Sequence, residues 1–262
     1  TATPELYTLS LPRALPICDA AQQWQQVESF IGQGVDAIIV NPTDTKAMQP
    51  IIKRAKAAGI PLVFLNRRPE TDLPEKMAYI GSDQKEAGEL QMEAVAKILN
   101  GKGNVMILMG DLSGEETRGR TGGVEEVAKK YPGIKIVDKQ SAKWLREESN
   151  IVTTSWLVSG KEFDAIVSNN DEMAIGAVYA AKQNPHEKLV IAGIDGTPDA
   201  LQFIKSGAMN VTIFQDGKAQ ADGAVEAAVA LVKGEHVEKY IMVPYQVITK
   251  DNYKDFVGKN TR

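Results

Sequence analysis

The sequence has very few of the side chains that build metal and redox sites. Its 262 residues include one cysteine, Cys18, and two histidines, His186 and His236. A single cysteine excludes an internal disulfide and a multi-cysteine metal site, and two histidines leave little for a metal centre or a catalytic triad. We therefore expect no metal and no cofactor.

The sequence also lacks a basic excess, a long apolar run and the common catalytic motifs. A net charge of -4 argues against a nucleic-acid partner, and no apolar run is long enough to span a bilayer. Neither G-x-S-x-G nor G-x-G-x-x-G after a strand occurs, and the turn at residues 101–104 does not continue as a phosphate-binding loop. We therefore expect no enzyme. The start shows no basic segment followed by an apolar one, as a signal peptide would.

What the sequence does contain is a regular alternation of helical and extended patterns from Asp19 onward. Short apolar runs bounded by turn residues predict buried strands, and the segments between them have helical periodicity. This alternation predicts an α/β fold with parallel sheets. The expected strands are 37–40, 62–65, 77–80, 105–109, 134–137, 163–167, 189–194, 211–214, 240–243 and 245–248.

Several helix starts are marked by capping residues. Asp19 is placed to cap the first helix, and Asp83 to cap a long helix that ends near Leu99. Ser113 and Glu116 have the spacing of a capping box, which predicts a helix start at that point.

Polar side chains follow many of the predicted strands. Asn66 and Arg67 come directly after one strand, and Asn170, Asp195 and Gln215 come at or just after the ends of three others. In open α/β sheets, ligands bind beyond the carboxyl ends of the strands. Arg120 and Trp144, which lie several residues after other strands, are further candidates.

Each candidate also has a purely structural interpretation. Asp and Gly favour turns, polar residues cap helices, and tryptophan often belongs to a core. On that interpretation the roles are a turn for Asp195, solvated charges for Arg67 and Arg68, an exposed helix face for Arg118 and Arg120, a core position for Trp144, a helix cap for Asn170 and a strand end for Gln215.

Six segments together resemble a known family. They are QVESFIGQGVDAIIVNPTDT, GIPLVFLNRRPE, YIGSDQKEAG, FDAIVSNNDEMAIGA, VIAGIDGTPDAL and VTIFQD. From about Asp19 to the end, the chain resembles the periplasmic sugar-binding proteins of ABC importers, of the ribose-binding type, and is most similar to the inositol- and rhizopine-binding group.

The resemblance implies two doubly wound parallel-sheet lobes that close on a small cyclic polyol or sugar. Lobe I would comprise residues 19–82 and 216–243, and lobe II residues 83–215 and 244–262. Three crossovers near Gly81, Gln215 and Pro244 would act as the hinge. The implied partner is an ABC permease, with no nucleic acid, the implied state is a monomer, and the implied location is the periplasm or the outer surface of a Gram-positive cell.

The resemblance also implies a ligand site made by seven residues. Five of them lie within these segments, namely Asn66, Arg67, Asn170, Asp195 and Gln215. The resemblance further matches Arg120 to an arginine on the helix after the first strand of lobe II, and Trp144 to an aromatic residue that packs on the sugar face. Asn66 stands where ribose binders usually have Asp, which favours an inositol-like ligand over ribose.

Residues 1–18 do not resemble the family and form an anomalous N-terminal segment. The family begins with a strand, a helix and a strand before the position of Asp19, and residues 1–18 are too few to supply them. We expect this segment to be foreign or frame-shifted sequence. The effector-binding core of a LacI-type repressor shares the fold and is the alternative function, although residues 1–18 contain no helix-turn-helix.

Overall fold

A computed structural model describes residues 20–184 and 189–260, which form two compact units. Unit 1 comprises the chain up to Ser82 together with Gly217–Val243, and unit 2 comprises Asp83–Asp216 together with the chain from Pro244 onward. The anomalous segment 1–18 and the predicted cap Asp19 lie outside the described residues. Within the described residues, no helix has both the length and the apolar character needed to cross a membrane.

Unit 1 is built on a four-stranded parallel sheet with the order β1-β2-β3-β9. Its elements are β1 (Ile38–Val40), β2 (Leu62–Asn66), β3 (Met77–Gly81), β9 (Tyr240–Met242), α1 (Ala20–Gln33), the 3-10 helix η1 (Thr45–Met48), α2 (Gln49–Ala58) and α8 (Gly217–Val232).

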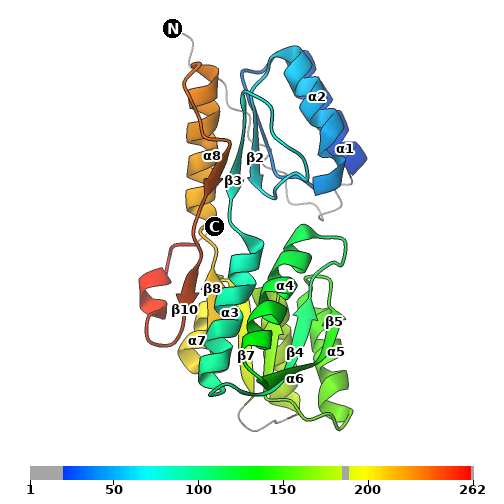
Figure 1. Cartoon of the computed structure of the whole chain (residues 1–262), viewed down its shortest axis with the longest axis vertical. Coiled ribbons are helices and arrows are strands. Elements are labelled where there is room, and N and C mark those ends of the chain that lie inside the picture. The colour runs from blue at the N-terminus through cyan, green and yellow to red at the C-terminus, as the bar shows by residue number, and fades with distance from the viewer. Residues whose placement is uncertain (1–19, 185–188, 261–262) are drawn as a thin grey trace. The chain divides into compact units, whose positions relative to one another are not determined.

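Helices cover both faces of the unit 1 sheet because alternate strand residues are apolar on both sides (Figure 1). Phe64 packs with α1 and α2 in one core, whereas its neighbour Val63 packs with α8 in another. The α2 helix ends at Gly59, whose φ of 71° is the left-handed conformation expected of a glycine cap.

Unit 2 is built on a six-stranded sheet with the order β10-β8-β7-β6-β4-β5. Its strands are β4 (Lys102–Met109), β5 (Gly133–Ser141), β6 (Ala165–Ser168), β7 (Val190–Asp195), β8 (Val211–Phe214) and β10 (Gln246–Ile248). Its helices are α3 (Gln84–Ile98), α4 (Glu115–Lys130), α5 (Arg146–Val158), α6 (Asp171–Gln183), α7 (Pro198–Ser206) and the 3-10 helix η2 (Tyr253–Phe256). Five strands are parallel, and the edge strand β10 runs antiparallel to β8.

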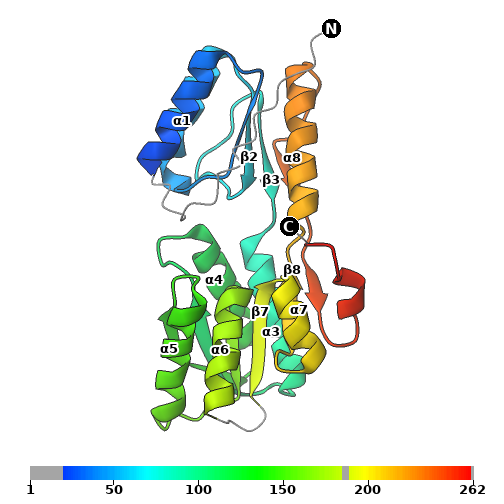
Figure 2. The ribbon, with the colours of Figure 1, turned by 180° about the vertical axis from the view of Figure 1, so that it is seen from behind.

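The two faces of the unit 2 sheet are also both covered. Ile107 packs with α3 and α4 in one core, and its neighbour Met106 packs with α5, α6 and α7 in the other. Figure 1 shows α3 and α4 in front of the sheet, and Figure 2 shows α5, α6 and α7 on the opposite side. The predicted α/β class with parallel sheets is confirmed.

The start of α4 differs from the sequence prediction. The predicted capping box of Ser113 and Glu116 is wrong. The helix begins at Glu115, with Gly114 at the cap position and no side-chain cap. Instead, the Asp111 carboxylate accepts hydrogen bonds from the backbone N–H and the hydroxyl of Ser113, at 2.9 and 2.6 Å. This local Asx turn competes with the cap that Ser113 would have made.

Helices α3 and α4 touch through their backbones. A Cβ atom built on Gly88 would lie 2.0 Å from the carbonyl oxygen of Arg120, and one built on Gly123 would lie 2.2 Å from that of Lys85. Only glycine permits this approach. The contact brings the side chain of Arg120 beside Gln84, the first residue of α3.

Candidate functional site

The unit 2 sheet has a topological switch point at β4. Its neighbours β5 and β6 lie on opposite sides of it, so the segments that follow β4 and β6 diverge and leave room for a ligand at their carboxyl ends. Gly110 follows β4 and Asn169 follows β6, and the backbone N–H of Gly110 donates to Asn169 Oδ1 at 3.2 Å. This edge of the sheet is where five of the seven predicted site residues gather.

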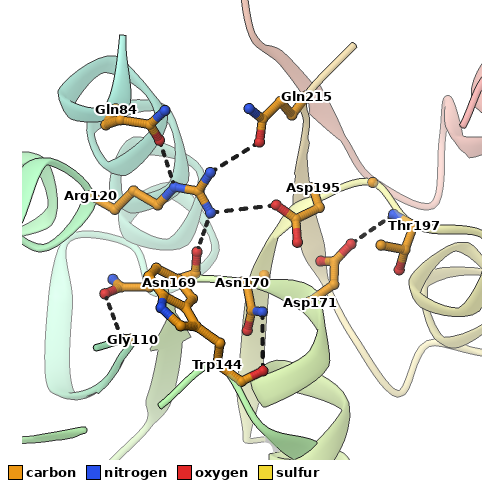
Figure 3. A network of polar contacts seen from close by, with 12 residues as sticks. Gln84, Gly110, Arg120, Trp144, Asn169, Asn170, Asp171, Asp195, Thr197 and Gln215 are labelled. Atoms are coloured by element: carbon orange, nitrogen blue, oxygen red, sulfur yellow. Dashed lines mark hydrogen bonds and ion pairs between the residues drawn. The ribbon is translucent and has the colours of Figure 1, made fainter. Parts of the chain in front are cut away.

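Arg120 is the centre of this edge (Figure 3). Its Nε donates to Gln84 Oε1 at 2.9 Å, and its Nη2 donates to Gln215 Oε1 at 3.0 Å. Its Nη1 donates to the carbonyl oxygen of Asn169 at 2.6 Å and lies 3.4 Å from Asp195 Oδ1. These four bonds use four of the five guanidinium N–H groups.

The burial of Arg120 decides between its two interpretations. Its exposed fraction is 4%, so the exposed-helix interpretation is wrong for Arg120, whereas Arg118 on the same helix is exposed. Burial lowers the pKa of Arg120, but Tyr245 and Asp195 raise it by more, and the pKa lies above its ordinary value. A buried charge is expensive unless its hydrogen bonds are made, which explains why so many acceptors converge on it.

Trp144 supplies an aromatic surface next to Arg120. The Arg120 Cζ atom lies 5.9 Å from the centre of the Trp144 ring, and the ring packs on Gly110, where a Cβ would lie 2.1 Å from it. Both Lys143 and Trp144 have left-handed backbones, with φ of 52° and 68°. Such strain in non-glycine residues is found mostly where function requires it.

Asn170 acts as a structural cap and also borders the site. Its Oδ1 accepts from the backbone N–H of Met173 at 3.0 Å, which caps α6, and its Nδ2 donates to the carbonyl oxygen of Trp144 at 3.4 Å. The helix-cap interpretation of Asn170 therefore holds. The second bond ties the loop of Trp144 to the end of β6, and one amide hydrogen of Asn170 has no bond assigned to it among these contacts.

Asp195 ends β7 in a strained turn. Its φ is 132°, and its side chain is 29% exposed. Asn260 holds this turn from outside, since its Nδ2 donates to the carbonyl oxygens of Asp195 at 3.1 Å and of Gln215 at 2.9 Å. The turn therefore presents the Asp195 carboxylate and the Gln215 amide together.

Asp171 supports the same turn from below. It is fully buried, and its carboxylate accepts from the backbone N–H of Thr197 at 2.8 Å (Figure 3). The same carboxylate accepts from the Thr212 hydroxyl at 2.6 Å. Burial, with the charge of Asp195 as a second cause, raises the pKa of Asp171 to about 8. Burial also raises the pKa of Asp195, although Arg120 acts in the opposite direction.

Asn66 and Arg67 belong to unit 1, at the carboxyl end of β2. Asn66 has a φ of 65°, and its carbonyl oxygen accepts from the Tyr79 hydroxyl at 3.0 Å. Arg67 Nη1 donates to the carbonyl oxygen of Pro42, in the loop after β1, at 3.3 Å. Arg68 lies over the ring of Tyr240 at 4.7 Å. The carboxyl edge of this sheet therefore carries two residues with polar side chains, Asn66 and Arg67, while Arg68 packs on the ring of Tyr240.

Sequence reasoning missed several residues of the unit 2 site. Gln84, Asn169, Asp171 and Tyr245 are all buried. Gln84 and Asn169 accept hydrogen bonds from Arg120, Tyr245 donates to Gln84, and Asp171 accepts from Thr197 in the turn after Asp195. Asn169 and Asp171 lie within the NNDEM segment that predicted Asn170, so position alone was a usable signal for them. Gln84 and Tyr245 are 161 residues apart, and no local pattern links them.

The arrangement can bind a neutral polar ring. Arg120 donates, Asp195 accepts, and Asn170 and Gln215 do both, while Trp144 provides an apolar face. Across residues 20–184 and 189–260, no group of three or more His, Cys, Asp or Glu side chains is arranged to hold a metal ion.

Comparison with known proteins gives consistent matches. The periplasmic binding protein domain family matches residues 18–236. A protein of Rhizobium meliloti, provisionally named as rhizopine-binding, is 44% identical over 92% of this chain and 80% of its own length. A xylitol-binding protein of Mycolicibacterium smegmatis is 39% identical over 89% of this chain and 67% of its own.

A solved structure agrees with these sequence matches. An ABC transporter solute-binding protein of Bacillus halodurans with bound myo-inositol superposes with a TM-score of 0.87 at 41% identity, covering 92% of this chain and 84% of its own. The likeness extends over both units, because so large a share of the chain is covered.

Proposed function

The chain belongs to the periplasmic binding protein family, and from that premise we propose that it captures a small cyclic polyol or monosaccharide for an ABC importer. An inositol-like ring is the favoured ligand. The family implies a location outside the cytoplasm, which we place in the periplasm or on the outer surface of a Gram-positive cell. The partner would be an ABC permease, and the protein would act as a monomer.

The relatives support a binding function over its two rivals. The relatives and the solved structure named above are described as binding proteins, and the solved structure is a solute-binding protein of an ABC transporter. They include sugar and polyol binders of ABC importers, and nothing in the comparisons favours a LacI-type repressor.

The observation that carries the proposal is the buried guanidinium of Arg120 between the Asp195 carboxylate and the Trp144 ring. A polyol offers hydroxyls that donate and accept, together with a flat face of C–H groups. The guanidinium donates to the oxygens of the ring hydroxyls, the carboxylate accepts from neighbouring hydroxyls, and the indole covers the apolar face. An anionic ligand, such as a phosphorylated sugar, would need a basic group that no carboxylate compensates, whereas Arg120 at this edge is paired with Asp195.

The strength of these groups suffices for micromolar binding. Hydrogen bonds to charged groups contribute about 1.5–3 kcal/mol each and neutral ones about 1 kcal/mol. A dissociation constant of 1 μM corresponds to about 8 kcal/mol. A few charged and several neutral bonds reach this value, with a surplus that offsets desolvation and ordering.

We further infer that units 1 and 2 are the two lobes, and that Asn66 and Arg67 complete the ligand site from lobe I. Asn170 and Gln215 would join Arg120, Trp144 and Asp195 in lobe II. Closure would follow because ligand contacts made only in the closed state favour that state. The three chain connections would be the hinge.

The test is a calorimetric titration of the purified protein with myo-inositol, with ribose as the comparison, and tryptophan fluorescence followed in parallel. We expect saturable binding of myo-inositol and much weaker binding of ribose. Arg120→Gln should abolish binding, whereas Arg118→Gln, an exposed arginine on the same helix, should leave it unchanged. A folded protein that binds neither ligand, or an Arg120→Gln variant that binds normally, contradicts the proposal.

A further inference from the structure

The chain passes between the two units three times. Next to each of these connections, unit 2 contains a residue that belongs to the hydrogen-bond network around Arg120. The junctions lie at Ser82/Asp83, Asp216/Gly217 and Val243/Pro244. On the unit 2 side of each junction, the second residue is Gln84, Gln215 and Tyr245, respectively.

All three of these residues are connected to one guanidinium. Arg120 donates through Nε to Gln84 Oε1 at 2.9 Å and through Nη2 to Gln215 Oε1 at 3.0 Å. The Tyr245 hydroxyl donates to the same Gln84 Oε1 at 3.1 Å. The amide oxygen of Gln84 therefore accepts from both Arg120 and Tyr245 and holds these two side chains in fixed positions relative to each other.

Burial makes these contacts obligatory for the folded protein. The exposed fractions are 2% for Gln84, 4% for Arg120 and 5% for Tyr245, so water cannot readily replace a lost partner. The Gln84 amide nitrogen has no hydrogen-bond partner among the described residues, which leaves the oxygen as the contact that orients this side chain. Gln215, in contrast, is only partly buried, and a ligand can reach it.

The bonds of Arg120 therefore fall into two groups. Those to Gln84 and to the carbonyl oxygen of Asn169 are buried and aim the guanidinium. The bonds to Asp195 and Gln215 are made to partly exposed side chains. Hydroxyls of a polyol can therefore compete with these two side chains for the Nη1 and Nη2 donors of Arg120. Binding then requires the bonds to Gln84 and Asn169 to persist, while the bonds to Asp195 and Gln215 are exchanged for bonds to the ligand.

We propose that Gln84 and Tyr245 are positioning residues, which hold Arg120 in its ligand-binding orientation and join it to the chain connections. The inference rests on the proposed function, since it assigns how the same site is kept in order. Neither residue is expected to touch the ligand. A ligand that takes the Arg120 donor from Gln215 alters a contact at one connection, while Gln84 and Tyr245 keep the guanidinium fixed to the other two.

The first test measures affinity for myo-inositol in variants that remove single contacts. Tyr245→Phe removes only the hydroxyl and should weaken binding about threefold to tenfold, and Gln84→Met, which removes the acceptor, about tenfold or more. Gln84→Glu keeps an acceptor for both donors and should bind more tightly than Gln84→Met. Tyr131→Phe is the matched control, since the Tyr131 hydroxyl donates to Glu93 at 2.7 Å away from Arg120 and its loss should leave affinity unchanged.

The second test needs no ligand and separates this inference from the proposed function. The Nε–H resonance of Arg120, assigned by its disappearance in Arg120→Lys, reports the bond to Gln84 in the free protein. In Gln84→Met it should shift and exchange with solvent at least about tenfold faster, and Tyr245→Phe should shift it measurably. Tyr131→Phe should leave it in place.

The outcomes are distinct. If the wild-type protein binds neither polyol but the resonance responds as expected, the proposed function fails and the positioning role stands. If the resonance is unchanged in Gln84→Met and Tyr245→Phe, or if both variants bind like the wild type, the positioning role is refuted.

Discussion

Two neighbouring glycines of α4 should respond in opposite ways to the same substitution. A Cβ at Gly122 meets no atom within 4 Å, whereas a Cβ at Gly123 would lie 2.2 Å from the carbonyl oxygen of Lys85 and 2.8 Å from the backbone nitrogen of Glu89. Both contact atoms of Gly123 belong to the backbone of α3 and cannot rotate away. Gly123→Ala must therefore push α3 and α4 apart.

The magnitude follows from two terms. Replacing glycine by alanine in a helix gains about 1 kcal/mol, and this gain is common to both variants. Overpacking costs about 1–3 kcal/mol and applies to Gly123→Ala alone. The difference in unfolding free energy between Gly122→Ala and Gly123→Ala should thus be about 1–3 kcal/mol, with Gly122→Ala the more stable variant and slightly more stable than the wild type.

Urea unfolding followed by circular dichroism measures this difference, and ligand titration adds a second readout. Arg120 lies one helical turn before Gly123, so a displaced α4 should also weaken binding in Gly123→Ala and not in Gly122→Ala. Equal stabilities for the two variants, or a more stable Gly123→Ala, would refute the close backbone contact.

Further predictions concern the turn at Asp195 and the unit 1 ends of the chain connections. Asp195→Ala should weaken polyol binding more than Gln215→Ala, because it removes a charged acceptor and leaves donors unpaired; equal losses in calorimetry would contradict this. Folding raises the Asp171 pKa from 3.8 to about 8, so the folded protein holds an extra proton between these values and stability should fall as pH rises through them. Asp171→Asn should reduce this fall, as urea midpoints at pH 5 and pH 8 would test, and an unchanged fall would contradict it. Gln220 Nε2 donates to the buried Ser82 hydroxyl at 2.8 Å, so Ser82→Ala should cost about 1–3 kcal/mol, against little change for Ser82→Thr, and a neutral Ser82→Ala in urea unfolding would show that the contact contributes nothing.

The sequence predicted best those elements whose ends carry a chemical signal. The helix at Asp171–Gln183 begins at Asn170, which caps it with its own side chain. The strand Val211–Phe214 is fully buried, apolar except for Thr212, and followed by the polar residue Gln215. The edge strand β5 extends to Ser141, well past the predicted 134–137. The prediction stopped too early because residues 138–141 are all polar and give no apolar pattern.

Strand positions alone predict site candidates only where a polar residue follows a buried strand at once. Asp195 and Gln215 were found because they follow buried strands, and the structure places both against Arg120. The burial of Arg120 depends on the approach of α3 to α4, and no spacing within α4 distinguishes it from Arg118. Gln84 enters the site by the same approach, so it could be recognised only in three dimensions.

The contact of Asn260 with the turn at Asp195 has a consequence for the order of synthesis. The side chain that bridges the carbonyl oxygens of Asp195 and Gln215 is made 65 and 45 residues after them. A nascent chain that has been made through Gln215, the residue after β8, therefore holds all seven proposed ligand residues but not the bridge. The turn that presents the Asp195 carboxylate and the Gln215 amide would therefore be complete only once the segment that includes Asn260 has left the ribosome and folded back onto unit 2.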